Sequence, residues 1–218
     1  MESMIRREGV RIESEHGVWE AALWMPAEPA GAVVFASENG SHRLRPSGDY
    51  LPGVLREARL ATLVFDAVAP AAAARRAGGV EGEAVGACLH AACEWLSRHP
   101  AAADLPLGLA GVGRGATAAL QVASERGRTV SAVVARGSCA QRGELPGIAG
   151  VAAPTLLIAG GLDDPAVACN RRAYAALRCK KRFEIVPGAT AAFDEPGSLE
   201  VVARLARNWF LQYLYQYA

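Results

Sequence analysis

The chain has 218 residues, 51% of them hydrophobic, and its Lys and Arg residues nearly balance Asp and Glu, leaving a net charge of +1. This length predicts a single α/β domain over residues 1–218 with a sizeable core. The near-neutral charge argues against nucleic acid as a partner, because phosphate neutralisation requires a basic surface. No segment approaches the roughly 18 consecutive apolar residues of a membrane span, and the first residues form no secretory signal, so we expect a soluble cytoplasmic protein with no membrane partner.

Short β-branched runs alternate along the chain with longer Ala- and Leu-rich stretches, which is typical of a parallel sheet covered by helices. Residues 10–14 and 18–25 come first and predict an antiparallel hairpin at a sheet edge. The buried strands that follow are continuous apolar runs, as expected for strands covered on both faces: residues 31–36, 61–65, 105–110, 130–135, 154–159 and 182–186.

Two stretches have helical spacing, residues 83–98 and 198–217. Their core-facing residues are Val85, Leu89, Ala92, Cys93 and Leu96 in the first, and Val201, Leu205, Trp209 and Leu214 in the second. Residues 67–79 are rich in Ala, Gly and Arg without apolar periodicity and predict a long loop that rims a cleft. Residues 137–153 are too few for a cap domain, so we expect the cleft to be open.

The cysteines form no CxxC pair and no cluster with histidines, so neither a zinc site nor a disulfide framework is indicated. We expect five reduced thiols, and neither a metal nor a cofactor. The residues are Cys88, Cys93, Cys139, Cys169 and Cys179.

Glycine-rich or polar turns follow three of the predicted strands, at the edge where open parallel sheets bind ligands. The first turn reads Gly-Val-Gly-Arg-Gly over residues 111–115 and leads into a helix. A hydrolase of this architecture carries Gly-x-Ser-x-Gly there, and the serine is absent. The second turn places Asp163 where the third member of a catalytic triad orients an imidazole. The third turn, residues 187–193, would carry a histidine base and has none.

These motifs together resemble the dienelactone hydrolase family of the α/β-hydrolase superfamily, from about Gly31 to the C-terminus. Family members read roughly His-Gly-Ser-Gly-Ser-Ser-Arg where this chain reads Ser-Glu-Asn-Gly-Ser-His-Arg over residues 37–43. The family's Gly-x-Ser-x-Gly falls on residues 111–115, its Gly-Gly-x-Asp on 160–163 and its Pro-Gly-Ala-Thr-His on 187–191. The resemblance implies an α/β-hydrolase fold, with a mostly parallel central sheet, helices on both faces and no cap domain.

The same resemblance implies a degenerate catalytic triad. Gly113 stands at the nucleophile, Ala191 at the histidine, and Ser37 and Glu38 replace the His-Gly of the oxyanion loop, so that Asp163 alone matches. Because the triad acts as a unit, losing its nucleophile removes covalent catalysis, and a carboxylate at Glu38 would oppose an oxyanion. Our first hypothesis is a hydrolase-fold protein without hydrolase activity, which binds an unknown small molecule or protein.

A ligand at this edge would meet the side chains of the surrounding turns. The candidate ligand-binding residues are Ser37, Glu38, Ser41, His42, Val112, Arg114 and Cys139. Arg114 either holds an anion together with the N–H groups at its helix N-terminus, or pairs with Glu38 or Asp163 and closes the cleft. We favour closure, because an unpaired buried acid is costly.

Two other functions stay open. An ester or lactone hydrolase could have a rewired site that uses Ser41, His42 or Cys139, with Glu38 or Asp163 beside them; the simpler interpretation is that these polar residues satisfy a loop and Cys139 packs as a small apolar residue.

The other alternative is a nucleotide-binding protein. Gly111, Gly113 and Ala116 follow the spacing of a dinucleotide fingerprint, and Arg136 lies about twenty residues further on, where an arginine could meet a 2′-phosphate. The fingerprint normally belongs to the first strand-helix unit of its domain, whereas two buried strands precede it here.

Two features have structural interpretations of their own. Asp163 could accept backbone N–H bonds within its turn and have no catalytic part. Residues 209–217 are unusually aromatic, and tyrosines outside the core-facing stripe could form a homodimer contact, unless the last turn of the helix is frayed.

Overall fold

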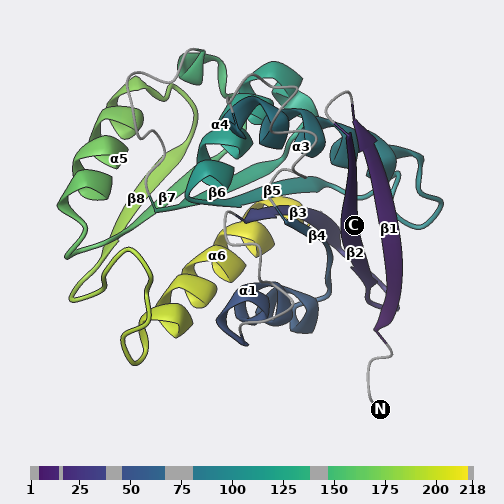
Figure 1. Ribbon diagram of the computed structural model, residues 1–218, viewed down its shortest axis with the longest axis horizontal. Helices are drawn as coiled ribbons and strands as arrows, with labels where there is room; N and C mark the ends of the chain where they lie inside the picture. The colour runs from purple at the N-terminus through teal and green to yellow at the C-terminus, as the bar shows by residue number, and fades with distance from the viewer. Residues whose placement is uncertain (1–4, 15–16, 38–45, 67–80, 138–146, 216–218) are drawn as a thin grey trace.

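A computed structural model describes residues 5–14, 17–37, 46–66, 81–137 and 147–215 of the chain (Figure 1). Over these residues the chain forms an eight-stranded sheet in the order β1-β2-β4-β3-β5-β6-β7-β8. β1 and β2 form the predicted antiparallel edge hairpin, and β3 to β8 are parallel to one another. The strands are β1 (Arg6–Ser14), β2 (Gly17–Met25), β3 (Gly31–Ser37), β4 (Leu60–Asp66), β5 (Leu107–Val112), β6 (Ala132–Arg136), β7 (Thr155–Gly160) and β8 (Lys181–Val186).

Helices cover both faces of this sheet, as the sequence predicts (Figure 1). One face carries α3 (Glu81–Arg98), α4 (Arg114–Arg126) and α5 (Asp164–Ala176), and the other carries α1 (Pro46–Glu57) and α6 (Ser198–Leu214). The five predicted core residues of α3 are all at most 3% exposed, which confirms the predicted apolar stripe of that helix. An apolar layer on each face of the sheet packs these helices against the parallel strands. This packing sets the position of the sheet edge at which the strands end.

Several predicted boundaries differ from the observed ones by two residues or more, and β1 begins at Arg6 rather than at 10. β5 begins at Leu107 rather than at 105, since Pro106 has no N–H to donate to a neighbouring strand. β6 begins at Ala132 rather than at 130, because the N–H of Val130 bonds to the carbonyl of Gly127 in the turn after α4. The last helix ends at Leu214 rather than at 217. Helices α1 and α5 have no counterpart among the predicted elements.

The order of the strands reverses between β3 and β5. From β3 the chain crosses to β4 on one side, and after β4 it returns to β5 on the other side. Ser37, the last residue of β3, pairs in register with Val112, the last residue of β5. Ligands bind open α/β sheets at such a reversal, beyond the carboxyl ends of the strands, so the turns after β3 and β5 form the candidate site.

Cys88 and Cys93 lie on the buried face of α3, and Cys88, Cys93, Cys169 and Cys179 are free cysteines. Burial raises the pKa of the Cys93 thiol to about 12, although the charge of Arg126 opposes the shift. Burial also raises the pKa of Cys88. Both thiols are therefore protonated packing groups at neutral pH. No helix in the described part of the chain is long and apolar enough to span a membrane.

Candidate active site

The turn after β5 has the backbone of a nucleophile elbow. Gly113, the residue directly before helix α4, has φ 59° and ψ −120°, a conformation that side chains disfavour and that hydrolases of this architecture impose on their catalytic serine. Its N–H donates to the carbonyl of Arg136 over 3.0 Å, and its carbonyl accepts from the N–H of Ala116 over 3.0 Å. The turn therefore keeps the geometry that presents a nucleophile, and the residue in it has no side chain.

The two glycines that flank the elbow are required by close backbone approach. A Cβ atom on Gly111 would lie 2.1 Å from the carbonyl oxygen of Gly115, and one on Gly115 would lie 2.1 Å from the carbonyl oxygen of Ala36. Real Cβ atoms do not come this close to a backbone oxygen. Packing of α4 against β3 and β5 is thus sufficient to explain Gly111 and Gly115 with no nucleotide involved.

Asp163 caps helix α5. Its Oδ1 accepts a hydrogen bond from the backbone N–H of Ala166 over 3.1 Å, which satisfies one of the free N–H groups of the first helical turn. The N–H of Leu162 bonds to the carbonyl of Ala189 over 2.9 Å, so the turn after β7 is tied to the turn after β8. The contact described for this carboxylate is a helix cap, which is the structural role foreseen for it.

Replacing this cap should lower stability measurably. Asp163→Ala is expected to reduce the free energy of unfolding by about 1 kcal/mol, because one backbone donor of α5 loses its acceptor. Asp163→Asn keeps an oxygen acceptor and is expected to stay close to the natural protein. Urea unfolding followed by circular dichroism would compare the three proteins. Equal losses in both variants would show that the charge of Asp163, and not its cap, stabilises the fold.

The turn after β8 presents a methyl group where the family keeps its histidine. Ala191 is exposed, whereas Phe193 is 1% exposed and has a φ of 58°, so the chain reverses sharply to bury this ring. Glu195 accepts a hydrogen bond from the N–H of Thr190 over 3.0 Å, and hydrogen bonding with Thr190 lowers the pKa of the Glu195 carboxyl. The loop is thus held by its own contacts and does not need a histidine to keep its shape.

Arg136 is the site residue whose position sequence reasoning missed. Its guanidinium lies over the ring of Phe193, 5.1 Å from the centroid, and its Nε is buried with no hydrogen-bond acceptor in the described ranges. Burial lowers the pKa of Arg136 to about 10, against the opposing attraction of Asp194. The Arg136 side chain as a whole is half-buried, and the role foreseen for it, contact with a 2′-phosphate, stays a prediction. The sequence feature that could have marked Arg136 as a site residue is its place directly after an apolar run that predicts a strand.

The remaining predicted site residues divide into two groups. Ser37 ends β3, Val112 is half-buried at the end of β5, and Arg114 is exposed in the first turn of α4. The others lie outside the described residues, and their roles in ligand binding or rewired catalysis stay predictions: Glu38, Ser41, His42 and Cys139. The pairing of Arg114 with Glu38 or Asp163 also stays a prediction, and the rim loop foreseen at residues 67–79 lies outside the described residues.

Two curated proteins are similar in sequence to most of this chain. The chain is 42% identical over 194 residues to proteins from two strains of Mycobacterium tuberculosis that are provisionally named phosphoribosyl transferases. The match covers 88% of this chain and 43% of the relatives, so the chain spans less than half the length of the curated relatives it matches. No protein-family model matches the chain.

Solved structures are similar over nearly the whole chain. A lidless α/β serine hydrolase from Xanthomonas campestris superposes with a TM-score of 0.76 at 15% identity, over 98% of this chain and 97% of that chain, and so shares the fold. A dienelactone hydrolase from Anabaena variabilis superposes with a TM-score of 0.85 at 35% identity, over 96% of this chain and 99% of that chain. With this identity over nearly the whole of both chains, the protein belongs to the dienelactone hydrolase family of the α/β-hydrolases, as the motifs predicted.

Proposed function

We propose that this protein is a hydrolase-fold protein without hydrolase activity, which acts by binding a ligand or a partner. The observation that carries the proposal is the elbow at Gly113, where the backbone adopts φ 59° and ψ −120° and no side chain is available to attack a substrate. Covalent ester hydrolysis needs a hydroxyl or thiol at this point, held beside a base. A hydrogen atom at Cα supplies neither a nucleophile nor a proton to transfer.

The other two triad positions support the same conclusion. Ala191 in the turn after β8 has no group that could accept a proton from a nucleophile. The carboxylate of Asp163 accepts a hydrogen bond from the N–H of Ala166 and so caps helix α5. In a catalytic triad the same carboxylate would orient an imidazole, which Ala191 does not provide. In the sequence, Glu38 places a carboxylate in the segment that takes the position of the oxyanion loop, where negative charge would oppose the transition state.

A binding role also suits the longer relatives. The Mycobacterium tuberculosis proteins carry the provisional name phosphoribosyl transferase, and less than half of their length is similar to this chain. We propose that the hydrolase-fold portion serves in such proteins beside a different activity, and that this chain has the corresponding binding role. A fold persists when its original chemistry has been lost, so retention of the sheet does not require retention of hydrolysis.

Turnover of short activated esters and lactones by the purified natural protein tests the proposal. We expect the observed rate to equal the rate in buffer, and a fluorophosphonate that labels activated serines to leave the protein unlabelled. The alternative, a rewired hydrolase, predicts protein-dependent turnover that Ser41→Ala, His42→Ala or Cys139→Ala abolishes. That outcome would overturn the proposal and assign the reaction to the residue whose change removes it.

A further inference from the structure

Strand β8 forms one edge of the sheet, at the end farthest from β1 (Figure 1). It pairs in parallel with β7 from Lys181 to Val186, and no strand in the described ranges pairs with its other side. The side chain of Lys181 donates to the carbonyls of Tyr174 and Leu177 at the end of α5, both over 2.6 Å, and so holds the strand against this helix. The edge is therefore a fixed template for one more strand.

The backbone bonds to β7 decide which groups of β8 face outward. The N–H of Thr155 bonds to the carbonyl of Lys180 over 2.8 Å. Further along, the N–H of Gly161 bonds to the carbonyl of Val186 over 2.8 Å. Because alternate residues of a strand direct their N–H and C=O groups to the same side, the even-numbered residues of this stretch face β7. The outward groups belong to the odd-numbered residues: Lys181, Phe183 and Ile185.

The side chains of β8 carry opposite charges on one face and apolar groups on the other. Arg182 and Glu184 are two residues apart, so they share a face, and they form an ion pair within the strand. Their side chains are 59% and 27% exposed. On the opposite face Phe183 packs against the core, while Ile185 is 39% exposed. The open edge thus presents a positive charge, a negative charge and an uncovered apolar side chain.

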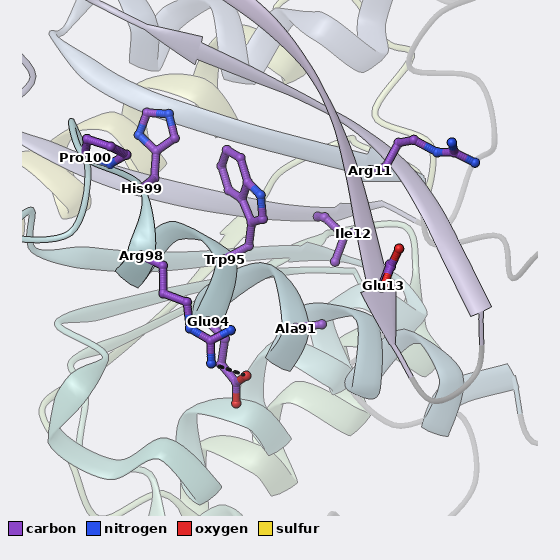
Figure 2. A pocket seen from close by; sticks show the side chains of 9 residues that line it. All are labelled: Arg11, Ile12, Glu13, Ala91, Glu94, Trp95, Arg98, His99 and Pro100. Atoms are coloured by element: carbon purple, nitrogen blue, oxygen red, sulfur yellow. Dashed lines mark ion pairs between the residues drawn. The ribbon is translucent and has the colours of Figure 1, made fainter.

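At the opposite edge of the sheet, the described residues around β1 carry charges of both signs without such an order. The groove beside β1 has a volume of about 450 Å³ and is lined by two arginines and two glutamates, together with apolar residues such as Trp95 (Figure 2). Arg11 of β1 also lies in register with Glu20 of β2. These charges balance one another and favour no particular occupant.

We propose that β8 pairs with β8 of a second copy of this chain, in antiparallel orientation about a two-fold axis at Phe183. In a two-fold pair, each residue faces the residue at the same distance on the other side of the axis. Backbone bonds form only where odd-numbered residues are opposite one another, because only these have outward groups. An axis near either end of the strand would leave much of it unpaired.

The charges select among the central axes. An axis at Arg182 would set the two copies of this arginine opposite each other, and an axis at Glu184 would do the same with two glutamates. The axis at Phe183 instead sets Arg182 of each copy opposite Glu184 of the other. These two residues have their backbone groups turned away from the partner strand, and side chains of opposite residues come closest at such positions.

The same pairing covers apolar surface on the face of α5. The two Phe183 side chains would lie beside each other, and Ile185 of each copy would lie beside Lys181 of the other. Tyr174 is 38% exposed on this face, with the Nζ of Lys181 4.6 Å from its ring centroid. The two eight-stranded sheets would thus continue into one another, with apolar contacts on one face and ion pairs on the other.

Sedimentation velocity of the purified full chain over a range of concentrations tests this interface. We expect a concentration-dependent dimer. Arg182→Glu and Glu184→Arg each set like charges opposite one another at two places in the dimer, so each is expected to weaken dimerisation about tenfold or more. Arg98→Glu, at an 80% exposed side chain of α3, is the matched control and should leave the dimer unchanged.

Mixing the two variants separates contact between copies from effects within one copy. A dimer of one Arg182→Glu chain and one Glu184→Arg chain has opposite charges at both places. The mixture is therefore expected to form a heterodimer at concentrations where neither variant dimerises alone. A change in the fold of each chain does not produce this result, because each chain in the mixture still lacks its internal ion pair.

The other outcomes would overturn the proposal. A natural chain that stays monomeric up to about 1 mM has no dimer interface at this edge. A dimer that both variants retain forms through another surface, such as the aromatic end of the chain. Variants that lose the dimer and do not associate on mixing would show that Arg182 and Glu184 act within each chain. The ester assay is independent of all these results, since the interface includes none of Gly113, Asp163 and Ala191.

Discussion

The combined variant Gly113→Ser, Ala191→His, Ser37→His, Glu38→Gly is expected to hydrolyse activated esters at least about a hundredfold faster than the natural protein, the order of gain that one positioned base provides. The elbow at Gly113 already has the backbone of a nucleophile turn, and Asp163 already stands in the turn after β7. The four changes supply the nucleophile, the base and a neutral oxyanion loop. Initial rates with nitrophenyl esters would measure the gain.

Partial variants are the control for this gain. Because a triad acts as a unit, Gly113→Ser alone is expected to add little activity. The three other changes without Gly113→Ser should add none. A combined variant that folds, shown by an unchanged circular dichroism spectrum, and yet remains inactive would mean that the turns after β3, β5 and β8 do not converge as the family resemblance implies.

Gly115→Ala is expected to lower the free energy of unfolding by about 3 kcal/mol or more, because the added methyl group meets backbone that cannot move aside. The new Cβ would lie 2.1 Å from the carbonyl oxygen of Ala36 and 2.7 Å from its carbonyl carbon. Relief requires α4 to shift away from β3 over its whole first turn. Chemical denaturation of the two purified proteins measures the difference.

Gly86→Ala in the middle of α3 is the matched control. Among the described residues, and apart from the backbone of α3 itself, no atom lies within 4 Å of a Cβ at Gly86, and alanine is favoured over glycine in a helix by up to about 1 kcal/mol. Gly86→Ala is therefore expected to stabilise the protein. A loss below about 1 kcal/mol for Gly115→Ala would show that the approach of α4 to β3 is looser than described, and overpacking would no longer account for this glycine.

Much of the fold could be predicted because its central strands, such as β6 and β7, are buried on both faces and read as unbroken apolar runs. Helix α3 was predictable for a related reason, since Leu89 and its neighbours on the stripe repeat at helical spacing. Helix α1 was missed because it contains Pro52 and Gly53, both weak helix formers. Helix α5 was missed because its inner face is made largely of small or polar residues such as Ala166 and Asn170.

The candidate site was predictable only as a set of positions. Spacing placed Gly113, Asp163 and Ala191 in the right turns, since each follows a recognisable strand. The contacts of these turns were not predictable. Nothing in the spacing indicates that the guanidinium of Arg136 lies over Phe193, because the two residues are far apart in sequence and the contact depends on the reversal at Phe193, with its φ of 58°.

By itself the sequence determined the class of fold, its family resemblance and the absence of a side chain at the elbow, because apolar runs and a glycine at a given spacing are local properties of the chain. Only the tertiary structure decided what the remaining groups do. It placed the guanidinium of Arg136 over Phe193, and it tied the turn after β7 to the turn after β8 through the N–H of Leu162 and the carbonyl of Ala189. These outcomes depend on which segments pack together, and packing between distant segments leaves no periodic signal in either of them.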